Sequence, residues 1–116
     1  MSDNAGSWFS TRVRLVAVVE GRGASHQMEC VHVFRATEWE SAFQRALELG
    51  RSHEEGYTNE AGNAVRWTLT DVVSLDLLRT DDLDGAEVYS EMTEVDPGND
   101  PPLERSPERS QPTQTL

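Results

Sequence analysis

Apolar and polar residues alternate along residues 8–20, which is typical of a β-strand with one buried face. The glycine-rich stretch at 21–25 predicts the turn that ends this strand. Residues 26–36 then predict the returning strand of a hairpin. One face of the first strand carries Phe9, Thr11, Val13, Leu15, Ala17 and Val19, and the other carries Trp8, Ser10, Arg12, Arg14, Val16 and Val18.

The pattern changes its period after residue 36. Thr37 and Glu40 have the spacing of a capping box, in which each side chain bonds an amide at the start of a helix. Apolar residues then recur at helical spacing, so we predict an amphipathic helix over about 38–53 that ends before Gly56. The predicted apolar face comprises Trp39, Ala42, Phe43, Ala46, Leu47 and Leu49.

Strand-like residues return at 65–78, and Tyr57 allows an additional short strand before them. The acidic turn at 81–85 precedes an alternating segment, 86–93, that predicts the final strand. The order β-β-α-β-β predicts an α+β two-layer sandwich. It comprises an antiparallel sheet of about four strands with one amphipathic helix on one face.

Composition divides the chain of 116 residues into three parts. All five prolines follow Asp96, among polar residues that cannot bury enough apolar surface to offset their ordering entropy. We therefore predict a single domain at 8–95, a disordered N-terminus at 1–7 and a disordered, Pro-rich acidic tail at 96–116. The single cysteine and the absence of a signal-peptide pattern predict a cytoplasmic location.

The charge of the chain excludes several classes of function. Ten arginines, no lysine and 21 acidic residues give a formal net charge of −11. Nucleic-acid binding needs a basic surface, and a membrane-spanning helix needs about 20 apolar residues in a row. Neither feature is present, so we expect no nucleic-acid partner and no membrane. Without lysine, a Schiff base and a phosphate-loop lysine are also excluded.

Five short motifs follow one another along the predicted domain: Trp8-Phe9, Phe34-Arg35-Ala36, Tyr57-x-Asn59 with Gly62, Val65-x-Trp67, and Asp84-Gly85-x-Glu87-Val88-Tyr89-Ser90. In this order and spacing they resemble the motifs of a family of small bacterial proteins, the domain-of-unknown-function 4288 family. The resemblance covers nearly all of 8–91 and implies a small α+β domain from a bacterium. It implies no activity and brings no catalytic residues.

The three histidines do not predict a metal site. His26 and His32 lie on one strand face, but six residues of strand separate them by roughly 20 Å. His53 lacks a second histidine four residues on, which the zinc-protease motif requires. Residues 80–91 have part of the spacing of a calcium-binding loop. Threonine at its first position and Glu87 in place of an aliphatic residue favour a simple acidic turn instead.

Other catalytic patterns are equally incomplete. No helix pattern follows Gly21-x-Gly23, so these glycines favour a hairpin turn over a phosphate-binding loop. Cys30 and His32 share a strand face about 6.5–7 Å apart, which is too far for a hydrogen-bonded nucleophile and base. We therefore expect no catalytic residues, no metal and no cofactor, and we expect that the protein is not an enzyme.

The hairpin predicts a surface for a ligand or a partner. If Glu20 pairs with His26, then Arg14 faces His32 and Arg12 faces Phe34 across the two strands. The sheet face away from the helix would then combine aromatic, aliphatic and arginine side chains, the types enriched at protein interfaces. The predicted face comprises Trp8, Arg12, Arg14, His32 and Phe34.

Two functions are compatible with this surface. The first is a small non-catalytic bacterial interaction module that either forms a homodimer or masks a basic protein partner, whose charge would complement the acidic chain. The alternative is a small-anion ligand-binding domain or enzyme with a pocket on the open sheet face. Arg12, Arg14 and His32 would bind the anion there, with Trp8 or Trp67 stacking on it.

Overall fold

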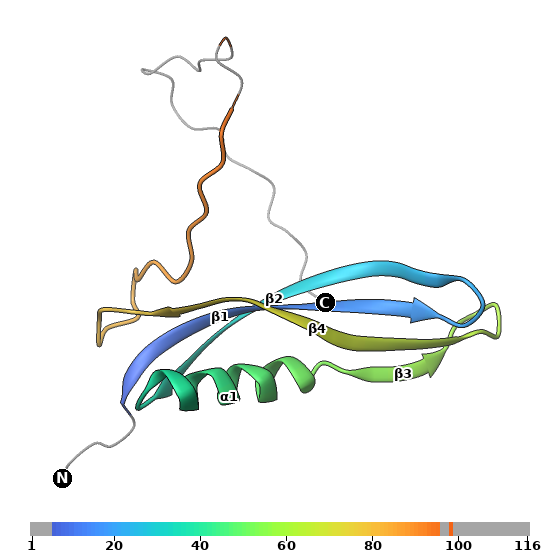
Figure 1. Ribbon diagram of the computed structural model, residues 1–116, viewed down its shortest axis with the longest axis horizontal. Coiled ribbons are helices and arrows are strands. Elements are labelled where there is room, and N and C mark those ends of the chain that lie inside the picture. The colour runs from blue at the N-terminus through green and yellow to red at the C-terminus, as the bar shows by residue number, and fades with distance from the viewer. Residues whose placement is uncertain (1–5, 96–97, 99–116) are drawn as a thin grey trace.

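The computed structural model describes residues 6–95 and residue 98, so the predicted tail and residues 1–5 lie outside the described residues apart from Gly98. The chain forms one four-stranded sheet and one helix, which confirms the predicted α+β class and the order β-β-α-β-β (Figure 1). The elements are β1 (Ser7–Val19), β2 (Gly23–Ala36), α1 (Trp39–Arg51), β3 (Glu55–Thr58) and β4 (Ala64–Leu77).

The sheet has the strand order β2-β1-β4-β3, and every neighbouring pair is antiparallel. β1 therefore lies in the middle, with β2 along one side and β4 along the other. β1 carries the most regular apolar alternation of the chain, and its inward residues Val13 and Leu15 are fully buried. β3 pairs with only the first part of β4, from Ala64 to Trp67.

The predicted pairing of Glu20 with His26 is wrong. β2 begins at Gly23, and Ala17 pairs with His26 after a bulge in the pairing next to Val18. The turn is tighter than predicted because Gly21 and Gly23 both adopt positive φ angles, which glycine tolerates without strain. Side chains alternate between faces along a strand, so a slip by an odd number of residues moves every β2 side chain to the opposite face.

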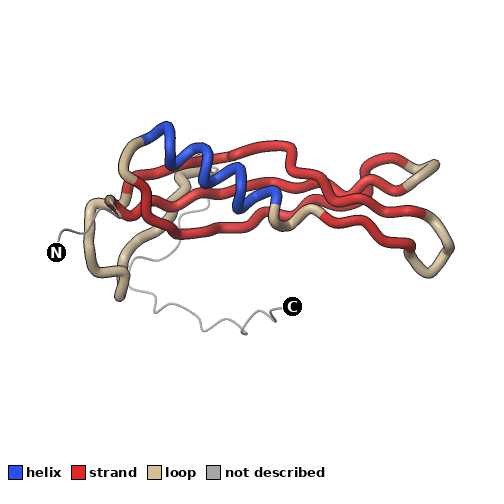
Figure 2. The backbone as a smooth tube through the Cα atoms, turned by 90° about the horizontal axis from the view of Figure 1, so that it is seen from below, coloured by secondary structure: helices blue, strands red, loops and turns tan. Residues whose placement is uncertain are grey.

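Helix α1 lies on one face of the sheet and covers about half of its length (Figure 2). Its contact with the sheet is a line of small buried residues spaced four apart: Ala42, Ala46 and Gly50. At Gly50 a methyl group would lie 2.7 Å from Leu69 Cδ1, so the helix packs directly on the Leu69 side chain of β4 at this position. Ala42 and Ala46 of the predicted apolar face, together with Gly50, therefore lie at the centre of the helix contact.

An aromatic cluster closes one end of this interface. Phe9 is almost fully buried, with its ring centroid 6.0 Å from that of Phe34 and 5.2 Å from that of Trp39. The predicted burial of the whole aromatic helix face is only partly confirmed, because Trp39 and Phe43 remain 53% and 41% exposed. Both rings lie at the margin of the helix–sheet contact, because the small residues occupy its centre.

The helix begins one residue later than the predicted cap. Glu38, in extended conformation, is the N-cap in place of Thr37, and its backbone N–H donates to Ser41 Oγ at 3.3 Å. Glu40 does not reach back to the cap. Its carboxylate instead accepts a bond from Gln44 Nε2 at 3.3 Å on the solvent side of the helix.

The predicted final strand at 86–93 is wrong, because this segment has no strand pairing and β3 supplies the fourth strand. Residues 79–91, called the strap below, leave the end of β4 and lie against the sheet face opposite α1 (Figure 1). Their alternating pattern reflects contacts of single side chains with the sheet rather than a ladder of backbone bonds.

Candidate interaction surface

The sheet face opposite α1, called the open face below, carries three of the five predicted site residues. Trp8, Arg12 and Arg14 occupy alternate positions of β1, and the Arg35 guanidinium from β2 lies 4.9 Å from the centre of the Trp8 ring. His32 and Phe34 lie on the opposite face, beneath α1, because of the changed register. The structure therefore does not bring the five residues into one pocket.

Arg12 and Arg14 are both engaged by carboxylates of the sheet itself. Glu29 on β2 accepts from Arg12 Nη2 at 2.5 Å and from Arg14 Nε and Nη2, each at 2.8 Å. Asp71 on β4 adds a contact with Arg14 Nη1 at 3.4 Å. The hydrogen bond from Arg14, with the bond and charge of Arg12, holds the pKa of Glu29 below its ordinary value against the effect of burial.

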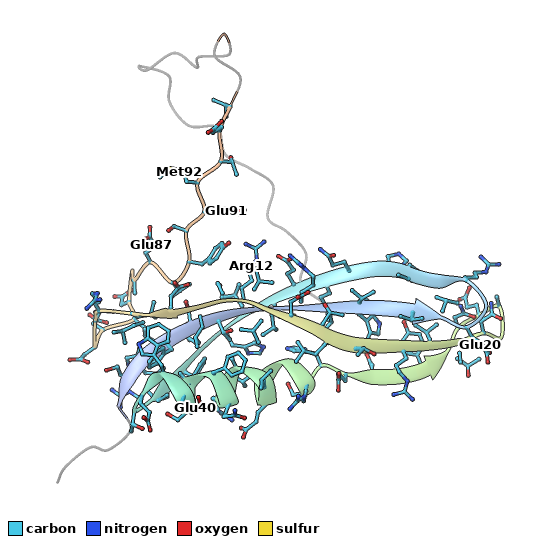
Figure 3. The ribbon with its side chains drawn as sticks, viewed as in Figure 1. Arg12, Glu20, Glu40, Glu87, Glu91 and Met92 are labelled. Atoms are coloured by element: carbon cyan, nitrogen blue, oxygen red, sulfur yellow. The ribbon has the colours of Figure 1, made fainter. Side chains whose placement is uncertain are left out.

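The strap adds a third group of contacts to this cluster. Ser10 Oγ donates to the Val88 carbonyl oxygen, and Arg12 Nη1 donates to the Tyr89 hydroxyl. Arg12 also lies 4.7 Å from the centre of the Tyr89 ring, and its Nη1 is 3.5 Å from a Glu91 carboxylate oxygen. Figure 3 shows Arg12 and Glu91 on the same side of the sheet, away from α1. The strap thus covers the part of the open face next to Trp8.

The remaining open face is apolar at its β2 edge. Val31 and Val33 point outward from β2 and are 49% and 40% exposed. β2 is the outermost strand of the sheet, so one side of its backbone faces no other strand among residues 6–95. The other edge of the sheet differs, because β3 covers one end of β4 and Glu54 Oε2 accepts the Leu69 backbone N–H at 2.9 Å. The exposed valines therefore border the less protected edge.

The single thiol of the chain is not activated, and the described residues contain no metal-binding cluster of three or more ligands. Cys30 lies on the helix side of β2, and burial raises the pKa of its thiol, which disfavours the nucleophilic thiolate. Within residues 6–95 and 98, no three His, Cys, Asp or Glu side chains come close enough together to hold a metal ion. In the same residues, no helix is long and apolar enough to cross a membrane.

Comparison with protein families assigns the chain to a family. The model of a family described as "Domain of unknown function (DUF4288)" matches residues 8–90. The chain belongs to the DUF4288 family. No curated protein and no solved structure matches the chain. The DUF4288 match includes Val88 and Tyr89, so the strap that contacts Ser10 and Arg12 is part of the DUF4288 domain rather than an addition to it.

Sequence reasoning missed two contacts in this DUF4288 domain. Glu29 joins Arg12 to Arg14, and pairing opposite charges across the hairpin could have selected the observed register. His32 and His53 approach each other to 2.9 Å between their Nε2 atoms. No local pattern indicates this second contact, because it depends on where the end of α1 lies over β2.

Glu29→Gln should destabilise the DUF4288 domain at pH 7. A neutral amide keeps part of the hydrogen bonding but loses the charge that two guanidinium groups share. The folded-state pKa of Glu29 lies below the ordinary value of 4.5. Its ion pairs therefore stabilise the fold above that value and are lost as the pH falls through the folded-state pKa. Urea unfolding at a series of pH values should show that the free energies of unfolding of the variant and the native chain converge as the pH falls.

Glu48→Gln is the matched control for this prediction. Glu48 pairs with Arg45 at 3.2 Å on the helix surface, where both side chains are exposed and an ion pair contributes little. Its free energy of unfolding should stay close to that of the native chain at every pH. Equal effects of the two substitutions would show that Glu29 does not stabilise the sheet through its arginines.

Proposed function

We propose that this DUF4288 protein is a non-catalytic interaction module that self-associates through the β2 edge of its sheet. The observation that carries the proposal is the pair of exposed valines, Val31 and Val33, on a strand whose outer backbone faces no other strand of the sheet. Such edges readily pair with another strand. An edge with apolar outward side chains is the kind that a protein partner covers.

A second copy of the chain is a suitable occupant because the β2 edge is self-complementary. If two β2 strands pair antiparallel about His32, Val31 of each copy lies opposite Val33 of the other. In the same register Glu29 lies opposite Arg35 of the other copy. Apolar and oppositely charged pairs across strands each stabilise a sheet. The twofold symmetry of this arrangement repeats every contact, as in most homodimers.

The open face supports the alternative of a small-anion site less well. Arg12 and Arg14 are already neutralised by Glu29 and Asp71, so an anion would have to displace carboxylates that are held in place. His32 lies on the other face, where it does not add to this charge. Masking of a basic protein is supported only by the net charge of −11 and stays a prediction. If it is correct, the affinity for the basic partner should fall steeply as salt is added.

The test is the solution mass of the full chain by light scattering over a range of concentrations. The native chain should pass from monomer to dimer as its concentration rises. The double variant Val31→Lys, Val33→Lys should associate at least about tenfold more weakly, because lysines on an edge strand oppose pairing. Circular dichroism should show an unchanged fold, since both side chains point away from the core.

Val73→Lys provides the matched control, because Val73 is 38% exposed but lies on β4 rather than on β2. This variant should dimerise as the native chain does. A native chain that remains monomeric at every concentration overturns the proposal. Equal weakening by the Val73 and the β2 substitutions would also overturn it, by showing that association does not use the β2 edge.

A further inference from the structure

His32 and His53 meet on the helix side of the sheet, opposite the face that carries Val31 and Val33. Their Nε2 atoms are 2.9 Å apart and their ring centroids 5.0 Å apart. Both side chains are partly buried, and neither takes part in the contacts of the open face. The two residues are 21 positions apart in the sequence, so the fold, and no local motif, creates this pair.

The backbone on both sides of the pair is held in place. His32 lies within β2, where it pairs with Thr11 of the central strand. His53 lies in the turn that follows α1, and its backbone N–H donates to the Gly50 carbonyl oxygen at 3.1 Å. The next residue, Glu54, donates to the Arg51 carbonyl oxygen at 3.0 Å and accepts from Leu69 through its side chain. The two imidazoles therefore meet without ordering a flexible segment.

The contact has a defined protonation pattern. A hydrogen bond between two Nε2 atoms requires that one carries a hydrogen and that the other presents a lone pair. Burial lowers the pKa of His32 and favours its neutral form. The charge of His53 and that of Arg45, which lies on α1, lower this pKa further. A neutral imidazole with an available nitrogen is the form of histidine that binds metals.

We propose that His32 and His53 form a two-histidine chelate for a divalent transition-metal ion of the class that prefers imidazole: Cu²⁺, Ni²⁺ or Zn²⁺. The ion would replace this hydrogen bond and lie to one side of the line between the two Nε2 atoms, because two metal–imidazole bonds of about 2.0–2.1 Å do not fit end to end within 2.9 Å. Both rings would turn about their side-chain torsions until their Nε2 lone pairs converge on the ion. The ring that donated this hydrogen would carry its hydrogen on Nδ1 instead, so that both rings stay neutral and both Nε2 lone pairs face the ion. Water molecules would complete the coordination. This inference does not depend on self-association.

The separation of the two nitrogen atoms ranks the metals. Metal–imidazole bonds are about 2.0–2.1 Å long. With Nε2 atoms 2.9 Å apart, two such bonds enclose an angle of about 90°. This angle suits adjacent positions of the tetragonal geometry of Cu²⁺ and Ni²⁺, whereas a tetrahedral Zn²⁺ site needs a separation of about 3.3–3.4 Å. The general affinity order of divalent metals also places Cu²⁺ above Ni²⁺ and Zn²⁺.

The experiment is a calorimetric titration of the full chain with each metal chloride in turn, at neutral pH. The native chain should bind one Cu²⁺ per chain, more tightly than Ni²⁺ or Zn²⁺. His53→Gln should weaken Cu²⁺ binding by at least about tenfold, because a single imidazole remains. Electron paramagnetic resonance of the copper-loaded chain should show coupling to two nitrogen nuclei, and to one in the His53 variant.

His26→Gln is the matched control, since the chain has three histidines and His26 is exposed, with Nδ1 3.0 Å from Ser25 Oγ. This variant should bind Cu²⁺ like the native chain. Because His53 lies in a turn, its substitution should leave the fold intact, which circular dichroism checks. The proposal is overturned if the native chain binds no Cu²⁺, if the His53 variant binds it equally well, or if the two variants lose binding alike.

Discussion

Replacing Phe9 with alanine should lower the free energy of unfolding by about 3–5 kcal/mol, the usual cost of removing a buried aromatic ring. Phe9 is 3% exposed and contacts both Phe34 and Trp39, so its loss leaves a cavity at the end of the helix–sheet interface. A loss of this size approaches the whole stability of a small domain. Urea unfolding of the full chain should therefore show a large unfolded fraction before denaturant is added.

Phe43→Ala makes the same chemical change on the helix, where the ring is 41% exposed. Its effect should be clearly smaller, about 1–2 kcal/mol, because 41% of this residue stays exposed to water after folding. The gentler Phe9→Leu retains most of the buried volume and should keep the chain folded well enough to measure. If Phe9→Ala were no more damaging than Phe43→Ala, the aromatic cluster would not be the main support of this end of the fold.

The second large effect concerns the line of small residues under α1. Ala46 is fully buried between the helix and the sheet, and Ala46→Leu adds three heavy atoms where the helix already lies close to β4. The extra volume must lift the helix or distort its neighbours, at a cost of about 1–3 kcal/mol. Chemical denaturation should show this loss even though leucine is nearly as good a helix former as alanine.

Gln44→Leu introduces the same side chain on the exposed side of the same helix, and its free energy of unfolding should change by less than about 0.5 kcal/mol. The comparison separates packing from helix propensity. A stable Ala46→Leu variant would indicate that the helix can move away from the sheet at little cost, contrary to the close contact at Gly50.

The elements of this fold with strong periodicity could be predicted from the sequence. The alternation in β1 and β4 and the helical spacing of α1 placed all three to within a few residues. Local choices were less predictable. Thr37 and Glu38 both stand before the helix, and Glu38 is the cap because it forms a capping box with Ser41, whose Oγ accepts the Glu38 backbone N–H. Ala42 and Ala46 belong to the predicted apolar face, but hydropathy does not indicate that they and Gly50 occupy its centre while Trp39 and Phe43 lie at its margin.

The candidate site was predicted less well because it depends on register and on distant contacts. One bulge in the pairing next to Val18 and a tighter turn moved His32 and Phe34 to the helix side of the sheet. The sequence of the strap predicts a strand because apolar and polar residues alternate along it. In the structure, however, Tyr89 contacts Arg12 through its side chain, and the strap has no strand pairing. Such contacts arise from the assembled fold and leave no periodic trace in the sequence.

The central position of the first strand sets the order in which the chain can fold. β1 can pair with β2 as soon as the short turn between them closes, and α1 follows directly in the chain. β4 must then reach back across the helix and β3, so that Phe9 meets Leu77 and Val19 meets Val65. Closing such long loops is entropically costly and slow. We therefore expect the docking of β4 to limit folding, and until β4 docks, one long edge of β1 is open to mispairing with other chains.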